Sequence, residues 1–112
     1  VKGAKRNSAE NLIQQVSLAQ SEEYANTGDY FITGGADACE ASKASSDAIQ
    51  DGLFDGEPII DRDASGNPDN DFEICVFGSG SSYTVFAKEM TTGSTCVISV
   101  GKYGTPQRSS GC

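Results

Sequence analysis

Apolar positions near the amino end of the chain recur with a helical period. Over residues 4–26 they return mostly every three or four positions, which places them on one face of an α-helix. The members of this stripe are Ala9, Leu12, Ile13, Val16, Ala19 and Tyr24. Gly28 follows the stripe and favours a helix end, because glycine readily adopts the left-handed conformation found there. The pattern predicts a long helix over residues 1–27.

Two features of this helix leave alternatives open. The helix either begins at Asn7, which with Glu10 resembles a capping box, or continues upstream, where only Gly3 disfavours it. Leu18 lies off the apolar stripe and is either an ordinary exposed leucine or a contact with a neighbouring molecule. Its own row holds Ala4, Ser8, Asn11, Gln15 and Glu22.

A second, weaker helix is predicted over residues 37–51. Asp37 is a good N-cap residue, Glu40 stands three positions later as in a capping box, and Gly52 marks the end. Alanine and serine form its faces. We expect this helix on the surface, held to the rest of the domain through Cys39.

Later in the chain the period of the apolar positions changes to two, which is typical of β-strands. The alternating segments are residues 71–77, 82–89 and 95–100. Short connections rich in glycine, serine and threonine, GSGSS and TTGS, favour antiparallel hairpins between them. Residues 57–61, EPIID, are a candidate for a fourth strand.

One face of such a sheet must be covered, and the amino-terminal helix carries the only adequate apolar stripe. Phe72, Ile74 and Val76 share the face toward the helix. Glu73 points to the opposite face, where a solvated position is expected. The predicted fold class is therefore α+β, with a long helix packed on a three- or four-stranded antiparallel sheet, followed by a tail that Cys112 pins.

The composition fits one small domain stabilised by disulfides. The 112 residues are 37% hydrophobic, and a chain of this size buries only about two thirds of the surface that its unfolded form exposes. There are four cysteines, no histidine and no Cys-x-x-Cys motif, so two disulfides are favoured over a zinc site. Disulfides indicate an oxidising compartment. Three pairings remain open for Cys39, Cys75, Cys96 and Cys112.

The charge of the chain is strongly and unevenly acidic. A net charge of −8 argues against nucleic-acid binding through a basic patch. Residues 37–73 hold eleven acidic and two basic side chains, whereas residues 1–10 hold three basic and one acidic. Two interpretations stand: the charge serves solubility, or the split favours head-to-tail attraction between copies.

The residues offer little for catalysis or for membrane insertion. Without histidine the commonest general base is missing, and every cysteine has a disulfide partner available, so we do not expect an enzyme. The chain contains no apolar run of about twenty residues. We expect that a leader was removed during maturation or that the chain is trimmed at Val1.

Residues 61–71, DRDASGNPDND, have spacing similar to that of a calcium-binding loop. Counted from the first aspartate, oxygen-bearing side chains fall at positions one, three, five and nine, and Gly66 stands at the sharp-turn position six. Position twelve is Phe72, where such loops carry an acid. The alternative is a plain acidic turn. The candidate calcium ligands are Asp61, Asp63, Ser65, Asp69 and Asp71.

The predicted long helix and its exit resemble a known family. Residues 4–31, AKRNSAENLIQQVSLAQSEEYANTGDYF, are similar to the second half of the amino-terminal helix of bacterial type IV pilins. In that family a run like Ala-Gln-x-x-Tyr leads to Gly-x-Tyr. The corresponding positions are Ala19, Gln20, Tyr24, Gly28 and Tyr30, with three residues rather than two between Gln20 and Tyr24.

The resemblance implies a pilin-like layout for the rest of the chain. Residues 28–60 form an αβ-loop with a short helix, residues 61–101 the antiparallel sheet and residues 102–112 a carboxyl-terminal loop. In the family a disulfide from a late strand closes this last loop, which implies the pair Cys96–Cys112 and leaves Cys39–Cys75. The second bridge departs from the commoner single-disulfide pattern.

The resemblance also implies a function and partners. Type IV pilins are structural subunits of surface filaments that serve adhesion or motility, and their partners are copies of themselves and the pilus assembly machinery. They reside in the inner membrane before assembly through an apolar amino-terminal half-helix, which the 112 residues do not include. No cofactor is required, apart from the candidate calcium. The expected interaction positions are Lys5, Arg6, Leu18, Lys102, Tyr103 and Arg108.

Two rival interpretations stand beside the pilin. A type II secretion pseudopilin shares the fold and typically binds calcium. A free secreted, disulfide-stapled and calcium-dependent binding module is the second rival. That module would have a cleavable signal peptide before Val1 and a helix start at Asn7.

Overall fold

The amino-terminal helix forms where its apolar stripe predicts. The computed structural model describes residues 2–112, so Val1 lies outside the described residues. Helix α1 spans Lys2–Thr27, 26 residues, and at 1.5 Å per residue it is about 39 Å long. It therefore crosses the whole molecule, whose longest dimension is 38 Å. Since α1 is already helical upstream of Asn7, a helix start at that residue is wrong.

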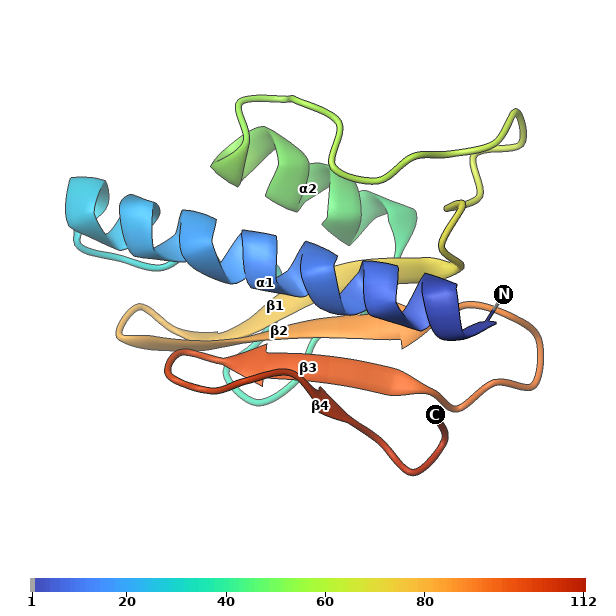
Figure 1. Cartoon of the computed structure of the whole chain (residues 1–112). Helices are drawn as coiled ribbons and strands as arrows, with labels where there is room; N and C mark the ends of the chain where they lie inside the picture. Colours follow the sequence, from blue (N-terminus) through green and yellow to red (C-terminus); the bar gives the residue numbers. More distant parts are fainter. Residues whose placement is uncertain (1) are drawn as a thin grey trace.

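Four antiparallel strands form one sheet in the order β1-β2-β3-β4 (Figure 1). The first three lie where the period of two predicts strands. Ile74 pairs with Ala87, and Val85 pairs with Val100, so apolar side chains meet across neighbouring strands on one face. The strand bounds are β1 Phe72–Ser79, β2 Ser82–Glu89, β3 Val97–Gly101 and β4 Gln107–Arg108.

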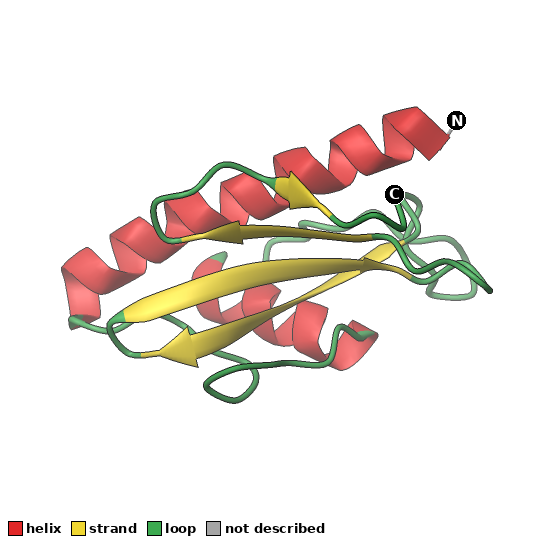
Figure 2. Ribbon diagram, turned by 90° about the horizontal axis from the view of Figure 1, so that it is seen from below, coloured by secondary structure: helices red, strands yellow, loops and turns green. Residues whose placement is uncertain are grey.

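The core lies between the helices and one face of the sheet. Figures 1 and 2 show α1 and α2 on the same side of the sheet. Burial of each large apolar side chain stabilises the fold by about 1.5–3 kcal/mol. The α+β fold class, with a long helix packed on an antiparallel sheet, is confirmed. The core includes Ala9, Leu12, Ile13, Val16, Ile49, Phe72, Ile74, Val76, Val85, Ala87, Ile98 and Val100.

The carboxyl end of α1 is fixed by a glycine and a buried amide. Gly28 has φ +83°, and its N–H donates to the carbonyl of Tyr24 at 2.8 Å, which ends the helix as predicted. The fully buried Gln20 donates to the carbonyl of Phe31 and accepts from its N–H, both at 2.7 Å. This side chain folds the chain back against α1 immediately after the turn.

Helix α2 begins later than the capping pattern at Asp37 predicts. It spans Lys43–Leu53, with Ser42 as N-cap in a reciprocal capping box with Ser45. The predicted start is therefore wrong, and so is the predicted end, because Gly52 lies inside the last turn and the helix ends one residue later.

The segment before α2 and the first turn of α2 cover the outer edge of β1. Thr33 donates its N–H to the carbonyl of Val76 and accepts from the Val76 N–H through its hydroxyl, both at 2.9 Å. Within this first turn, the Ser45 hydroxyl donates to the carbonyl of Ile74 at 2.6 Å, and the Ser46 hydroxyl accepts from the Ile74 N–H at 3.0 Å. These contacts satisfy an edge that would otherwise be free to pair with other chains.

The fourth strand comes from the tail rather than from EPIID. Residues 57–61 form no strand, whereas Gln107 and Arg108 pair with Ser99 and Ile98 of β3. The sheet thus covers residues 72–108 and not the predicted 61–101, because the disulfide at Cys112 draws the tail back along β3.

Among the described residues, no helix combines the length and the apolar character needed to cross a membrane.

Candidate functional site

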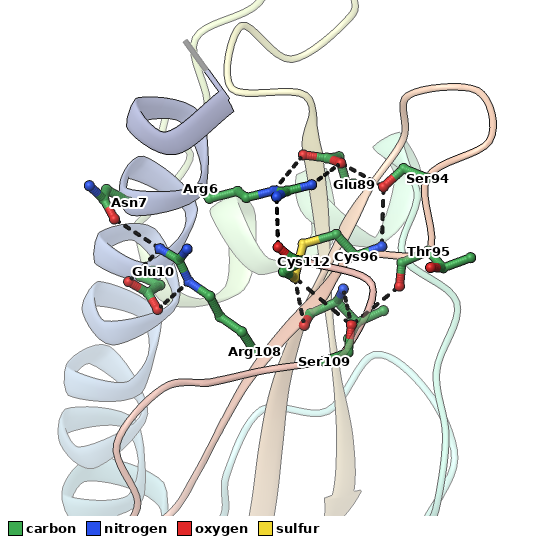
Figure 3. Close-up of a disulfide and its surroundings, with 11 residues drawn as sticks. Arg6, Asn7, Glu10, Glu89, Ser94, Thr95, Cys96, Arg108, Ser109 and Cys112 are labelled. Carbon is green, nitrogen blue, oxygen red and sulfur yellow. Dashed lines mark hydrogen bonds and ion pairs between the residues drawn. A yellow bond between two sulfur atoms is a disulfide. The ribbon is translucent and has the colours of Figure 1, made fainter.

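Two disulfides connect the loops to the sheet. Cys39 is bonded to Cys75 of β1, and Cys96, immediately before β3, is bonded to Cys112 (Figure 3). Both are the pairs that the resemblance implies. The first holds the segment before α2 against the sheet, and the second closes a loop that contains β4.

The basic residues near the amino end fasten α1 to the sheet. The Arg6 guanidinium donates to both carboxylate oxygens of Glu89, at 3.1 and 3.3 Å, and to the carbonyl of Cys112 at 2.9 Å (Figure 3). Arg108 from β4 donates to the Glu10 carboxylate of α1 at 2.9 Å. Arg6 and Arg108 were both predicted as interaction positions, and both side chains already bind carboxylates within the domain.

Glu89 is the most deeply buried member of this network. Its side chain is 1% exposed, and that of Arg6 is 15% exposed. The hydrogen bond from Arg6 is the main reason why the pKa of Glu89 lies below its ordinary value, and the Ser94 hydroxyl adds to the effect against the opposing cost of burial. The carboxylate is therefore held in its charged form by a partner on α1.

A second buried ion pair lies at the edge of β1. Glu73 is 5% exposed and accepts from Arg62 at 2.7 and 2.8 Å and from the Ser46 hydroxyl at 2.8 Å. The hydrogen bond that Arg62 donates to Glu73 is the main cause of the raised pKa of Arg62. The expectation that Glu73 is solvated is wrong, because α2 and the segment that carries Arg62 cover this position.

Ion pairing inside the domain changes the distribution of free charge. Within residues 2–112, five cations pair with five carboxylates. Because each pair is neutral, the net charge of −8 comes from the other side chains. Lys5, which pairs with Asp71 at 3.0 Å, and Arg6 do not supply a free basic end. Head-to-tail attraction, one of the two interpretations of the charge split, therefore needs another cation.

The predicted calcium residues do not converge on one point. The Asp63 carboxylate accepts from the N–H groups of Ser65 and Asn67 at 2.9 and 3.0 Å, as in a turn stabilised by aspartate. Asp71 binds Lys5. Within residues 2–112 no group of three or more histidine, cysteine, aspartate or glutamate side chains is arranged to hold a metal ion. Calcium binding by this segment stays a prediction.

A cluster of tyrosines, which the sequence patterns did not suggest, surrounds Lys102 at the end of the molecule where α1 ends. The rings of Tyr24 and Tyr30 stack with centroids 4.6 Å apart, and the ring of Tyr83 lies 4.7 Å from that of Tyr30. The Lys102 ammonium lies 5.0 to 5.9 Å from the ring centroids of Tyr24, Tyr30 and Tyr103, which is cation–π range. Hydrogen bonding with Tyr103 is the main cause of the raised pKa of Lys102.

Leu18 and Tyr103 are the most exposed large apolar side chains. Leu18 is 73% exposed and Tyr103 is 89% exposed. These two of the six predicted interaction positions remain open to a partner. The sequence signal for Tyr103 is its place between two glycines, in GKYG.

A cleft of about 230 Å³ separates α1 from the segment that follows α2. Its apolar wall is formed by Leu12, Ile59 and Ile60, and its polar rim includes the carboxylates of Asp61 and Asp69. Neither carboxylate takes part in the ion pairs formed within residues 2–112. The helix side of the rim is formed by Ser8, Asn11 and Gln15.

The helix residues that line the cleft belong to the same row of α1 as Leu18. Ser8, Asn11 and Gln15 share a helical row with Leu18, which lies one turn beyond Gln15. An acidic hollow and an exposed leucine therefore lie side by side on the face of α1 that points away from the sheet. This pairing is typical of a protein contact rather than of a catalytic centre.

No family model matches the chain, and neither the curated proteins nor the solved structures contain a significant match to it.

Proposed function

We propose that the chain is the globular part of a structural subunit of a type IV pilus, a surface filament of the adhesion or motility class. The role is mechanical and needs no catalytic group. Its partners are further copies of the chain and the machinery that assembles them. In the full subunit an apolar helical segment precedes α1.

The long helix α1 is the observation that carries the proposal. It is buried against the sheet on one side, and its opposite row leaves Leu18 73% exposed. At this exposure the leucine side chain contributes little to the core of the domain. In a filament, this row of α1 faces neighbouring subunits.

The arrangement of the sheet and the disulfides supports the same proposal. An antiparallel sheet packed on the helix, followed by a segment closed by Cys96–Cys112, is the layout that the resemblance implies. The network from Arg6 to Glu89 and Cys112 ties the helix, the sheet and the closed segment together. A subunit that must transmit tension along a filament gains from this coupling.

The test is carried out on the bacterium whose genome encodes the chain. Surface filaments are sheared from the cells, purified and digested for mass spectrometry, and the same cells are imaged by electron microscopy after deletion of the gene. We expect peptides from residues 2–112 in the filaments and loss of the filaments in the deletion strain. Restoring the gene on a plasmid controls for secondary mutations.

Three results would overturn the proposal. Surface filaments that persist in the deletion strain and contain no peptide of this chain would exclude it as their subunit. A cleavable signal peptide encoded immediately before Val1 would favour the free secreted module. Recovery only in periplasmic fractions, together with a loss of protein secretion in the deletion strain, would favour the pseudopilin.

A further inference from the structure

The turn between β3 and β4 presents an aromatic ring and a cation at the surface. Gly101 and Gly104 close it through a hydrogen bond of 3.3 Å, with Lys102 and Tyr103 between them. Tyr103 is 89% exposed, and the Lys102 ammonium is held by the carbonyl of Ser81 at 3.0 Å. The tip therefore has a fixed polar group beside a ring that contacts water on nearly all sides.

The cleft beside α1 has complementary chemistry. In its apolar wall Leu12 and Ile60 are buried, so the half-buried Ile59 offers the surface that an aromatic ring can contact. The cleft has a volume of about 230 Å³. The carboxylates of Asp61 and Asp69 on its rim suit a phenolic hydroxyl and an ammonium group. Of the residues that the structure describes, no basic one lines the cleft.

We propose that the Lys102–Tyr103 tip of one copy docks into the cleft of a second copy. The Tyr103 ring packs on the apolar wall, its hydroxyl donates to a rim carboxylate, and Lys102 faces Asp61 and Asp69. The inference rests on the proposed function, because it names the contact through which subunits associate. Aromatic residues at the centre of a contact, with opposite charges around them, are the usual anchors of protein interfaces.

The distribution of cations along the chain favours this donor. Lys2 lies close enough to Glu89 to help lower the pKa of that carboxyl, so its charge is partly used inside the domain. Lys88 is exposed on the outer face of the sheet and stands on a strand rather than on a protruding turn. Lys102 is half-buried and contacts the Ser81 carbonyl and the tyrosine rings. It forms no ion pair with a carboxylate within residues 2–112, and it stands beside the exposed ring of Tyr103.

The positions of the tip and the cleft predict an open assembly. In Figure 1 the turn after β3 lies on the sheet side of α1 and near the end of that helix, whereas the segment of residues 59–70 lies on the other side of α1. A contact between two different surfaces of one molecule is heterologous, and it repeats without closing unless the rotation forms a ring. The contact thus generates a chain of subunits rather than a closed pair.

Cysteine trapping tests the contact in the 112-residue chain. Gly104→Cys places a thiol beside the Tyr103 ring and keeps the ring, and a side chain at this position meets only the Gly101 nitrogen, at 3.6 Å. It is combined with Asn11→Cys on the rim of the cleft, oxidised mildly and analysed on a non-reducing gel. We expect a ladder of dimers, trimers and larger species that a reductant removes, with positions 11 and 104 joined by mass spectrometry.

The matched control moves the second thiol out of the cleft. It combines Gly104→Cys with Asn26→Cys, which replaces an exposed asparagine of α1 that does not line the cleft. This variant gives no ladder if the tip docks as proposed.

Three outcomes would overturn the inference. These are no cross-link above monomer, an equal ladder in the control, or cross-linking that stops at a dimer joined through two copies of position 104. The exposed positions are chosen so that the fold is kept, and circular dichroism checks this for each variant.

A charge exchange separates this inference from the proposed function. In the bacterium, Lys102→Glu is expected to reduce filament yield by about tenfold or more, because like charges then meet at the contact. Asp61→Lys with Asp69→Lys has the same effect, and combining all three changes restores filaments. Lys88→Glu, on the outer face of the sheet, is the control and leaves the yield unchanged.

The experiments distinguish a failure of this inference from a failure of the proposed function. If the native strain has filaments that lack this chain, the proposed function fails, whereas the trapping experiment still measures the contact. If native filaments contain the chain and Lys102→Glu leaves them undiminished, only the docking of the tip is refuted.

Discussion

Removal of the Arg6 side chain isolates the largest electrostatic link between α1 and the sheet. In Arg6→Met the methionine keeps much of the apolar stem and loses the guanidinium. Glu89, whose side chain is 1% exposed, would then remain as a buried carboxylate with only Ser94 as a side-chain donor. The carbonyl of Cys112 would lose its donor as well.

The expected cost follows from this burial. Removing one partner of a buried ion pair typically destabilises a protein by about 3–5 kcal/mol, because the other charge is left uncompensated. We take the lower end, about 3 kcal/mol, since Ser94 still donates to Glu89. For a domain of this size, this lowers the melting temperature by roughly 13 °C.

The loss of stability in Arg6→Met should depend on pH. Arg6 lowers the pKa of Glu89 below its ordinary value of 4.5, so the stability it contributes is present above that value and is lost as the pH falls below it. In Arg6→Met this contribution is missing. The difference in free energy of unfolding between native protein and variant should therefore be large at about pH 7 and much smaller at about pH 3.

The assay is urea unfolding followed by circular dichroism at both pH values. Arg108→Met is the matched control, because Arg108 pairs with a partly exposed Glu10, and its loss should cost far less. Glu89→Gln in the Arg6→Met background should recover part of the stability at neutral pH. Equal losses for the two arginines, or a loss from Arg6→Met that is the same at both pH values, would refute the reasoning.

Three further substitutions test the packing. Gly52→Ala normally stabilises a helix interior by about 1 kcal/mol, but here the new methyl group would meet the ring of Phe31, so we expect a lower melting temperature; a rise would contradict the packing. Gln20→Met removes both hydrogen bonds to the Phe31 backbone and should cost about 2–4 kcal/mol in urea unfolding, because buried polar groups lose their partners; a loss below about 1 kcal/mol would show that water replaces the amide. Cys96→Ser with Cys112→Ser opens a loop of separation 16 and should cost about 3 kcal/mol, and unchanged unfolding would argue against that bridge as a stabilising element.

The periodic elements could be predicted from the sequence because each has one strong pattern. The stripe from Ala9 to Val16 has the helical period, and the strands have the period of two, so α1, β1, β2 and β3 lie where expected. Helix α2 was harder, because two capping boxes compete for its start. Ser42 prevails over Asp37 because the Cys39–Cys75 bridge and the hydrogen bonds of Thr33 with β1 hold the preceding residues against the sheet.

The buried charges could not be predicted from local pattern. Glu73 alternates with apolar neighbours as a solvated residue does, and only the arrival of Arg62 and Ser46 from elsewhere in the chain makes its burial tolerable. The same holds for Arg6, whose partner is 83 residues away. The candidate site depends on such distant pairs, because they decide which cations and carboxylates remain free.

The two disulfides also limit how far the chain can extend when force is applied to its ends. They join residues separated by 36 and 16 positions, so nearly half of the chain is enclosed in covalent loops that a pull on the ends cannot straighten. Force applied to the first turns of α1 reaches Cys112 directly through Arg6, and from there it passes across a covalent bond to the start of β3. The domain should therefore extend little under tension, because a force on the helix is transmitted to the sheet before any loop can extend.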